Sequence, residues 1–111
     1  MSTYVVKVEK DEEVLEKLGR EVEALGVEHG SITLIGAVQQ ATVSVMPKEN
    51  PLDDILTDYD QPFELTGTGE VVQGKVHVHV TLGGDGLVVA GHLHRAVVLD
   101  WFVRAYITDL D

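Results

Sequence analysis

The sequence contains no cysteine and few aromatic residues. The absence of cysteine excludes disulfide bonds, thiolate metal ligands and cysteine nucleophiles, so a transition-metal site would have to use histidine, aspartate, glutamate or water. Aromatic side chains make up 5% of the chain, which is little material for platforms that stack nucleobases. We therefore expect Trp101 and Phe102 to be core or subunit-contact residues.

Positive charge is also scarce. Eight lysines and arginines stand against 19 aspartates and glutamates, which gives a net charge of −11. A surface this acidic repels phosphate backbones and lacks the basic footprint of a nucleic-acid-binding protein. We therefore expect no direct binding to nucleic acid, although a basic partner could be attracted.

Long apolar runs are absent as well. No stretch approaches the roughly 20 apolar residues that a membrane-spanning helix needs. The first residues, Met1-Ser2-Thr3-Tyr4, do not begin a basic segment followed by a long apolar one, as a secretion signal would. The expectation is a cytoplasmic protein with no membrane partner.

The residues that are present predict one α+β domain spanning residues 1–111, a length that fits a single core. Residues 11–25 are predicted to form the one main helix, because their apolar side chains recur at the helical period and Gly26 follows as a natural stop. The other regular segments are rich in β-branched residues and predict a mostly antiparallel sheet. The predicted strands are residues 3–9, 31–37, 40–46, 63–65, 70–72, 75–82, 87–92 and 95–108.

Two features are predicted to interrupt the sheet. Residues 47–62 are polar and contain three prolines, so we expect a long surface loop there. Gly67 and Gly69 are expected to separate the predicted strands 63–65 and 70–72, and Gly74 to end the second of these.

Two His-x-His pairs are the most distinctive feature of the chain. His77 and His79 share one strand face because side chains alternate along a strand. If residues 83–86 form the hairpin loop, Leu82 pairs with Leu87, so that His77 lies opposite His92 and His79 is its diagonal neighbour. A slip by one residue would move His92 to the other face.

Three histidines on one face predict a metal site. His77, His79 and His92 could supply three imidazole nitrogens and leave one position open for water or a substrate, as in catalytic zinc sites. Zinc is the first expectation for a divalent metal, with nickel, copper and iron left open. His94 falls on the same face and could replace a ligand or act as a nearby acid or base. Glu64 and Glu70 lie on neighbouring predicted strands and could also approach.

The order of these segments resembles the PPC ("plants and prokaryotes conserved") domain family. The matching segments are Gly30–Ala37, Pro62–Leu65, Val76–Leu82 and Gly91–Leu93, which contain a glycine-flanked strand, paired histidines and a Gly-His-Leu. The resemblance implies an α+β fold with an antiparallel sheet, a homotrimer, and a family in which prokaryotic members carry a DNA-binding label without a defined biochemical role. It covers nearly the whole chain.

The sequence departs from that family pattern in three respects. It has no Arg-Gly-Arg-Pro AT-hook and no basic cluster, which argues against direct contact with DNA. Ala90 stands where the family usually has a second glycine, and His94 is an additional histidine. We therefore expect a binding or regulatory protein that holds a divalent metal. The alternatives are a DNA-associated regulator that acts through a partner and a metal-dependent enzyme on a small molecule.

Overall fold

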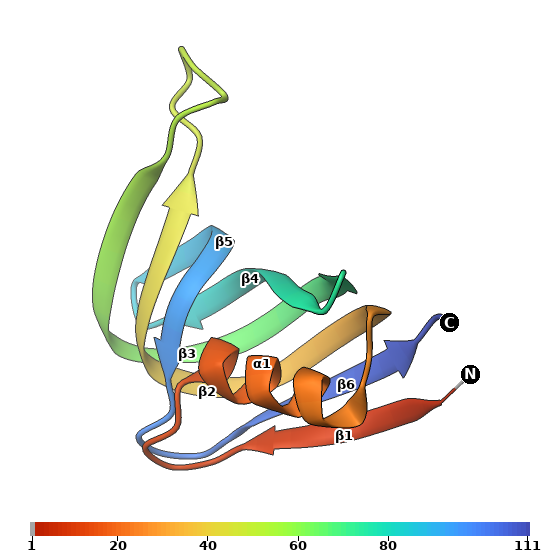
Figure 1. Cartoon of the computed structure of the whole chain (residues 1–111). Coiled ribbons are helices and arrows are strands. Elements are labelled where there is room, and N and C mark those ends of the chain that lie inside the picture. Colours follow the sequence, from red (N-terminus) through yellow and green to blue (C-terminus); the bar gives the residue numbers. More distant parts are fainter. Residues whose placement is uncertain (1) are drawn as a thin grey trace.

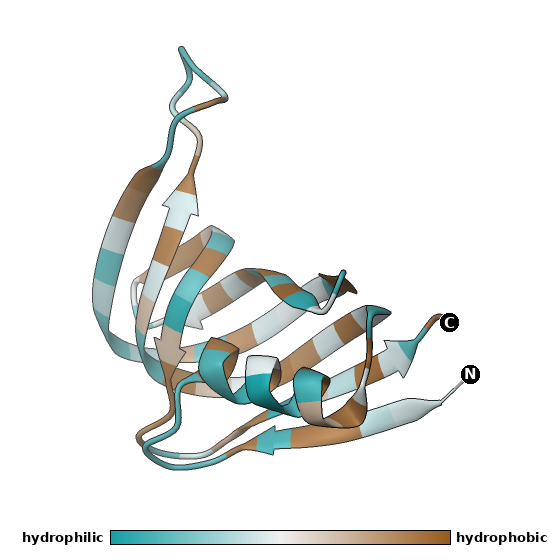
Figure 2. Cartoon of the chain, viewed as in Figure 1, coloured by the Kyte–Doolittle hydropathy of each residue, from teal (hydrophilic) through white to brown (hydrophobic). Residues whose placement is uncertain are grey.

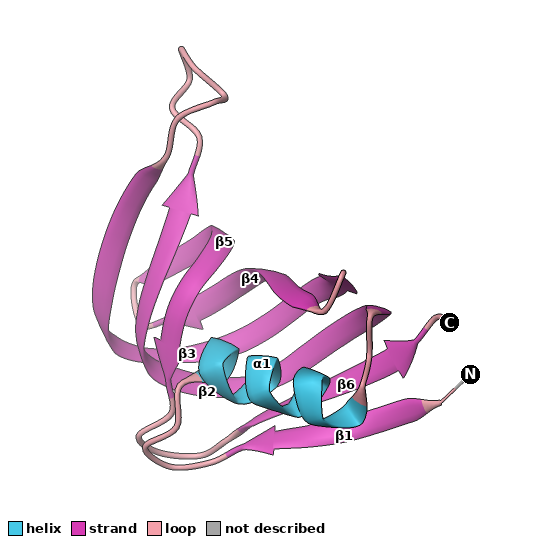
Figure 3. Cartoon of the chain, in the orientation of Figure 1, coloured by secondary structure: helices cyan, strands magenta, loops and turns pink. Residues whose placement is uncertain are grey.

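The structure is a computed structural model that describes residues 2–111. It contains one helix and an antiparallel sheet of six strands, which confirms the predicted α+β character (Figure 1, Figure 3). The elements are β1 (Thr3–Val8), α1 (Val14–Leu25), β2 (His29–Val45), β3 (Ile55–Val72), β4 (Lys75–Gly84), β5 (Leu87–Val97) and β6 (Val103–Asp109).

The sheet closes on itself over part of its width. The strand order is β1-β6-β2-β3-β4-β5, and β5 also pairs with β2. Strands β2, β3, β4 and β5 therefore form a ring, in which β5 pairs with the second half of β2. Strand β6 pairs with the first half of β2 along the same edge, and β1 pairs with β6. In Figure 1, β2 and β3 continue out of this ring as a projecting hairpin.

Helix α1 forms where the sequence predicts it, but it begins at Val14. The carboxylate of Glu13 accepts hydrogen bonds from the backbone N–H groups of Leu15 and Glu16, so Glu13 is the N-cap. Gly26 ends the helix in the left-handed conformation, with φ of 69°. The helix buries one apolar face, made of Val14, Leu18 and Val22.

The strands alternate between buried and exposed side chains. Figure 2 shows a corresponding banding of hydrophobic and hydrophilic residues along the strands. The core is a single cluster rich in valine and leucine, into which β2 contributes Ile32 and Leu34, β4 contributes Val78 and Val80, and α1 contributes its apolar face. We call the opposite, solvent-facing side of the strands the outer face. The polar side chains of the strands lie on this outer face, and the histidines of β4 and β5 are among them.

The predicted loop over residues 47–62 is wrong in its second half. Strand β3 begins at Ile55, and Ile55 to Asp60 pair with β2 although most of their side chains are exposed. A strand exposed on both faces has no apolar alternation that could reveal it. Pro62 is accommodated at the irregularity where the pairing of β2 with β3 shifts between Val38 and Gln40.

The strand boundaries differ at the glycines too. The predicted strands 31–37 and 40–46 are one strand, β2, and the segments on either side of Gly67 and Gly69 belong to the single strand β3. A Cβ at Gly69 would collide with the backbone oxygen of His77 on β4. These glycines therefore permit a close approach of backbones and do not end the strand.

The predicted strand 95–108 is two strands. Strand β5 ends at Val97, and β6 begins at Val103 after an irregular connection. Trp101 lies in this connection with φ of 77° and 77% of its surface exposed, so it is not a core residue. The other alternative, a subunit contact, stays a prediction. Phe102 is partly buried, and the Arg104 guanidinium lies 4.3 Å from its ring centroid.

The hairpin between β4 and β5 has a different register from the predicted one. Its turn is the two-residue Asp85-Gly86, so Leu82 pairs with Val89 and His79 lies opposite His92. The difference is two residues, an even number, so every histidine keeps its predicted face. His77 now lies opposite Glu70 of β3.

Among residues 2–111, no helix is long and apolar enough to cross a membrane. The one helix described, α1, has 12 residues.

Candidate functional site

Four histidines gather on the outer face, where β4 meets β5. We call His77, His79, His92 and His94 the histidine cluster. His92 pairs with His79 of β4 on one side and with Ser44 of β2 on the other, so it marks the point where β5 passes from β4 to β2. Gly91 allows this crossing, because a Cβ there would collide with the backbone oxygen of Ser44.

The rings of the three predicted ligands contact one another. The ring centroids of His77, His79 and His92 are 4.9 to 5.5 Å apart. The Nε2 atoms of His77 and His79 are 3.2 Å apart, so one of them donates a proton to the other. The structure thus brings together the three residues that the sequence singled out.

Glu70 extends the cluster on β3. Its Oε2 atom lies 3.4 Å from Nδ1 of His77, and both side chains are about half exposed. A carboxylate beside Nδ1 favours a proton on that nitrogen and leaves Nε2 of His77 with a free lone pair. In this hydrogen-bond network His79 is then the residue that donates from Nε2.

His94 has a different partner. Its Nε2 atom lies 2.7 Å from Oγ of Ser44, which is only 2% exposed. His94 falls at the point where the pairing between β2 and β5 shifts, and its ring centroid lies 4.4 Å from that of His92. Because its Nε2 already has a hydrogen-bond partner, His94 is less available than the other three to bind a metal.

His92 is the most perturbed histidine of the cluster. Burial lowers its pKa from the usual value of 6.5, and the neighbouring His94, His77 and His79 lower the pKa further because they would repel a second positive charge. The carboxylate of Asp54 acts weakly in the opposite direction. His92 is therefore a neutral imidazole with a lone pair at neutral pH.

The rings are close but do not converge on one point. Among residues 2–111, no group of three or more histidine, aspartate or glutamate side chains is arranged to hold a metal ion. The planes of His79 and His92 are only 17° apart, so these two rings stack. Stacked rings present parallel faces, whereas metal ligands must aim their nitrogens at a common centre. Side-chain rotation would be needed before all three could bind one ion.

Two neighbours of the cluster, Ser44 and Asp54, were not predicted from the sequence, and the position of Glu70 was left open. Glu70 could have been placed opposite His77, because Gln73-Gly74 is a two-residue turn signal between the two strands. No local sequence signal marks Ser44 and Asp54. They come near the cluster only because β5 pairs with β2 and so closes the ring of strands.

The remaining candidates lie apart from the cluster. His29 forms its own contact of 3.3 Å with Asp111, near the C-terminal end of β6. Glu64 pairs with Gly83 and lies four residue pairs beyond Thr68, which is the partner of His79. It is therefore not an acid or base for the histidine cluster within one chain.

Solved structures share this fold at low sequence identity. A plant- and prokaryote-conserved (PPC) protein from Pyrococcus horikoshii has a TM-score of 0.88 and 24% identity, over 100% of this chain and 80% of that one. A metal-containing protein from Archaeoglobus fulgidus has a TM-score of 0.87 and 23% identity, over 98% of this chain and 79% of that one.

A third similar structure, from Bacteroides thetaiotaomicron, is named as a candidate DNA-binding protein. It has a TM-score of 0.86 and 23% identity, over 98% of this chain and 79% of that one. No curated protein matches this sequence. The family profile described as the Plants and Prokaryotes Conserved (PCC) domain matches residues 1–111, and the chain therefore belongs to this family.

Proposed function

We propose that the histidine cluster binds one divalent metal ion per chain through His77, His79 and His92, and that zinc is the ion bound. The observation that carries this proposal is the 3.2 Å separation of the Nε2 atoms of His77 and His79. Two nitrogens bound to one tetrahedral zinc, each at about 2.1 Å, would be roughly 3.4 Å apart. These two side chains therefore already have a spacing that suits a shared ion.

His92 would complete the site by rotation of its side chain. It lies directly opposite His79, and its lowered pKa keeps the ring neutral, as a ligand must be. Glu70 supports the proposal as an orienting residue, because metal-binding histidines commonly donate their other ring N–H to a carboxylate. When bound, the metal would supply an open position for water or another small ligand.

The test is zinc titration of the chelator-treated protein, prepared without a polyhistidine tag and followed by calorimetry. We expect one zinc per chain. The double change His77→Ala and His79→Ala should abolish stoichiometric binding, while His94→Ala should weaken it less. His29→Ala is the matched control, since it removes a histidine outside the cluster. Stoichiometric zinc retained by the double variant, or no zinc bound by the unaltered chain, would refute the proposal.

The same titration has two further readouts. Binding should release more protons as the pH falls toward about 6.5, because only a protonated imidazole loses a proton when it binds zinc. A neutral ring keeps its one hydrogen on the nitrogen that does not bind, so the binding enthalpy should depend on the buffer mainly at low pH. Affinity should fall as the pH drops below about 6.5, where imidazoles become protonated. His92 itself resists protonation, because burial and the neighbouring histidines lower its pKa.

We infer a binding or regulatory role for the assembled protein, with the homotrimer implied by the family resemblance as its working form. The DNA-binding designation of the Bacteroides relative suggests a second candidate, association with DNA. The net charge of −11 favours an indirect route, in which a basic partner protein would contact the nucleic acid. A gel shift with duplex DNA, in the absence of any partner, tests whether the route is indirect.

A further inference from the structure

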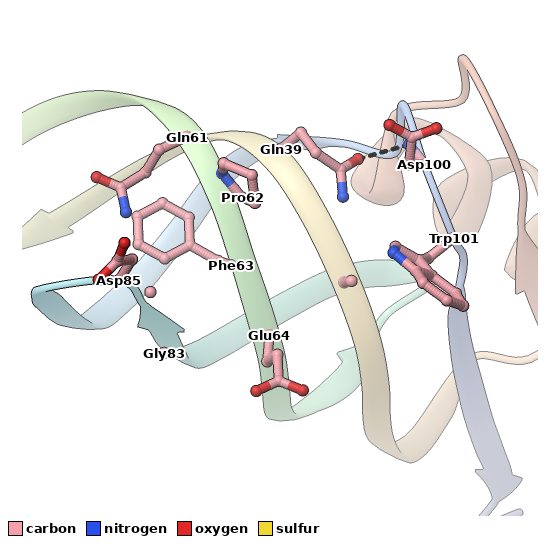
Figure 4. Close-up of a pocket in the computed structure, with 11 residues that line it drawn as sticks. Gln39, Gln61, Pro62, Phe63, Glu64, Gly83, Asp85, Asp100 and Trp101 are labelled. Atoms are coloured by element: carbon pink, nitrogen blue, oxygen red, sulfur yellow. Dashed lines mark hydrogen bonds between the residues drawn. The ribbon is translucent and has the colours of Figure 1, made fainter.

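A second site candidate lies on the outer face, away from the histidine cluster. It is a cavity of about 850 Å³ between β2, β3, the β4–β5 turn and the connection from β5 to β6 (Figure 4). None of the four clustered histidines lines it. Its walls combine three carboxylates with an exposed indole and an apolar floor.

The charge of this cavity is of one sign. Glu64, Asp85 and Asp100 line it, and no lysine or arginine does. Within residues 2–111, none of these three carboxylates takes part in an ion pair. A ligand that carries positive charge would therefore meet carboxylates whose charge the chain itself leaves uncompensated.

Trp101 provides an aromatic surface beside these carboxylates. Its side chain is 77% exposed, although the backbone on both sides is held in place. Oε1 of Gln39 accepts hydrogen bonds from the N–H groups of Leu99 and Asp100, at 2.6 and 2.8 Å. The N–H of Ala37 donates to the backbone oxygen of Phe102 at 2.9 Å. An indole on such a fixed connection can bind a cation over its face.

The carboxylates are spread out, which selects the kind of cation. Figure 4 shows Asp85 and Asp100 toward opposite ends of the cavity, with Pro62 and Phe63 between them. No three acidic side chains among residues 2–111 converge to hold a single ion. A compact ion such as Mg²⁺ needs converging oxygens. An extended ligand with several separated charges and apolar spacers would instead match both the rim and the floor.

We propose that this cavity binds an aliphatic polyamine. The ammonium groups would approach Glu64, Asp85 and Asp100, and the methylene chain would lie on Pro62 and the indole of Trp101. Each exposed ion pair contributes little alone, so the affinity would come from several pairs together with the contact to the indole.

The test uses spermidine and the chelator-treated protein. Trp101 is the only tryptophan in the chain, so its fluorescence reports directly on the cavity. Spermidine should change this fluorescence with one ligand per chain, and calorimetry should give the same affinity. Butylamine, which carries one charge, should bind at least about tenfold more weakly because it can pair with only one carboxylate at a time. Mg²⁺ at the same ionic strength should not displace spermidine.

Variants separate a specific site from general attraction to an acidic protein. The double change Glu64→Gln and Asp100→Asn should weaken spermidine binding about tenfold, the loss of two exposed ion pairs. The matched control is Glu21→Gln with Glu23→Gln on α1, which removes the same charge outside the cavity and should leave the affinity unchanged.

A third variant fills the cavity without touching its charges. A Cβ at Gly83 meets no atom within 4 Å, so Gly83→Leu can place its side chain in the opening while the fold stays intact. Binding should be lost in this variant, with unchanged circular dichroism. An equal loss of affinity in the α1 control pair, displacement of spermidine by Mg²⁺, or unaltered binding in Gly83→Leu would overturn the proposal.

Discussion

The two halves of strand β2 lie in different surroundings. The first half, from His29 to Gly36, runs between β6 and β3, and its apolar residues Ile32 and Leu34 are buried in the core that α1 also lines. The second half runs between β3 and β5, keeps Val38, Ala41 and Val43 in the same core, and leads into the hairpin tip, which we define as residues 45–56. There, Val45, Met46, Leu52, Ile55 and Leu56 are all about half exposed or more.

This difference shows that the chain completes its core in only one of the two regions. The side chains near α1 are buried within one chain, whereas the apolar side chains of the tip have no cover in it. Large exposed apolar patches mark interaction surfaces in soluble proteins. The comparison therefore predicts that substitutions near α1 affect folding, whereas substitutions at the tip affect assembly.

The largest effect is expected from a matched pair of leucines. Leu18 on α1 is 0% exposed, and Leu56 at the tip is 55% exposed. Leu18→Ala should lower the free energy of unfolding by about 2–5 kcal/mol, because it leaves a cavity in the core. Leu56→Ala should change it by less than about 0.5 kcal/mol in the dissociated chain. Urea denaturation at low protein concentration measures both, and equal losses would refute the division into two regions.

A smaller effect is expected where α1 joins β5. The Glu13 carboxylate accepts hydrogen bonds from the N–H groups of Leu15, Glu16 and Ala96, at 2.9 to 3.0 Å. Glu13→Ala should cost about 1–3 kcal/mol, since it removes the helix cap and leaves the partly buried N–H of Ala96 without its acceptor. Glu13→Gln keeps an acceptor oxygen and should lose less. If the Glu13→Ala variant unfolds at the same urea concentration as the unaltered chain, the hydrogen bonds of Glu13 contribute nothing to the free energy of unfolding.

The tip should show its effect in the mass of the assembly. Leu56→Asp places a charge in the exposed apolar surface of the tip and should reduce the sedimentation mass from about three chains to one. Ala24→Asp on α1 adds the same charge at an exposed position and serves as the control. If Leu56→Asp leaves the trimer intact, the subunit contact does not involve the tip. If the unaltered chain is a monomer at micromolar concentration, the prediction of a trimer is wrong.

The smallest expected effect is on DNA. The chain has too few basic residues to neutralise phosphates, because its eight lysines and arginines stand against 19 aspartates and glutamates. A gel shift with duplex DNA should show no complex at physiological salt and low micromolar protein. A complex that dissociates as the salt concentration rises would overturn this expectation and favour direct contact with DNA.

The sequence predicted those parts of the fold that a local pattern encodes. The helical spacing of Val14, Leu18 and Val22, followed by Gly26, located α1 to within three residues at its start. The shared face of His77 and His79 also followed from alternation, and His92 lies on that face because the predicted register differs by an even number of residues. Their exact pairing did not, because a four-residue loop was assumed where Asp85-Gly86 is a two-residue turn.

What could not be predicted depends on contacts between distant segments. Residues 55–60 lack apolar alternation and are a strand only because β2 pairs with them. The hydrogen bond between Ser44 and His94 joins residues 50 positions apart and depends on β5 crossing to β2. The exposure of Trp101 follows from a break between β5 and β6 that no proline marks.

The pairing of β1 with β6 has a consequence for the order of folding. Thr3 lies beside Thr108, so the first strand finds its partner only after about a hundred more residues have been made. At about 5–20 residues per second, a ribosome needs several seconds for that stretch. During this interval Val6 and Val8, both buried in the finished sheet, have no strand to pair with. The nascent chain therefore exposes an unpaired apolar segment, which makes it a target for chaperones until synthesis reaches β6.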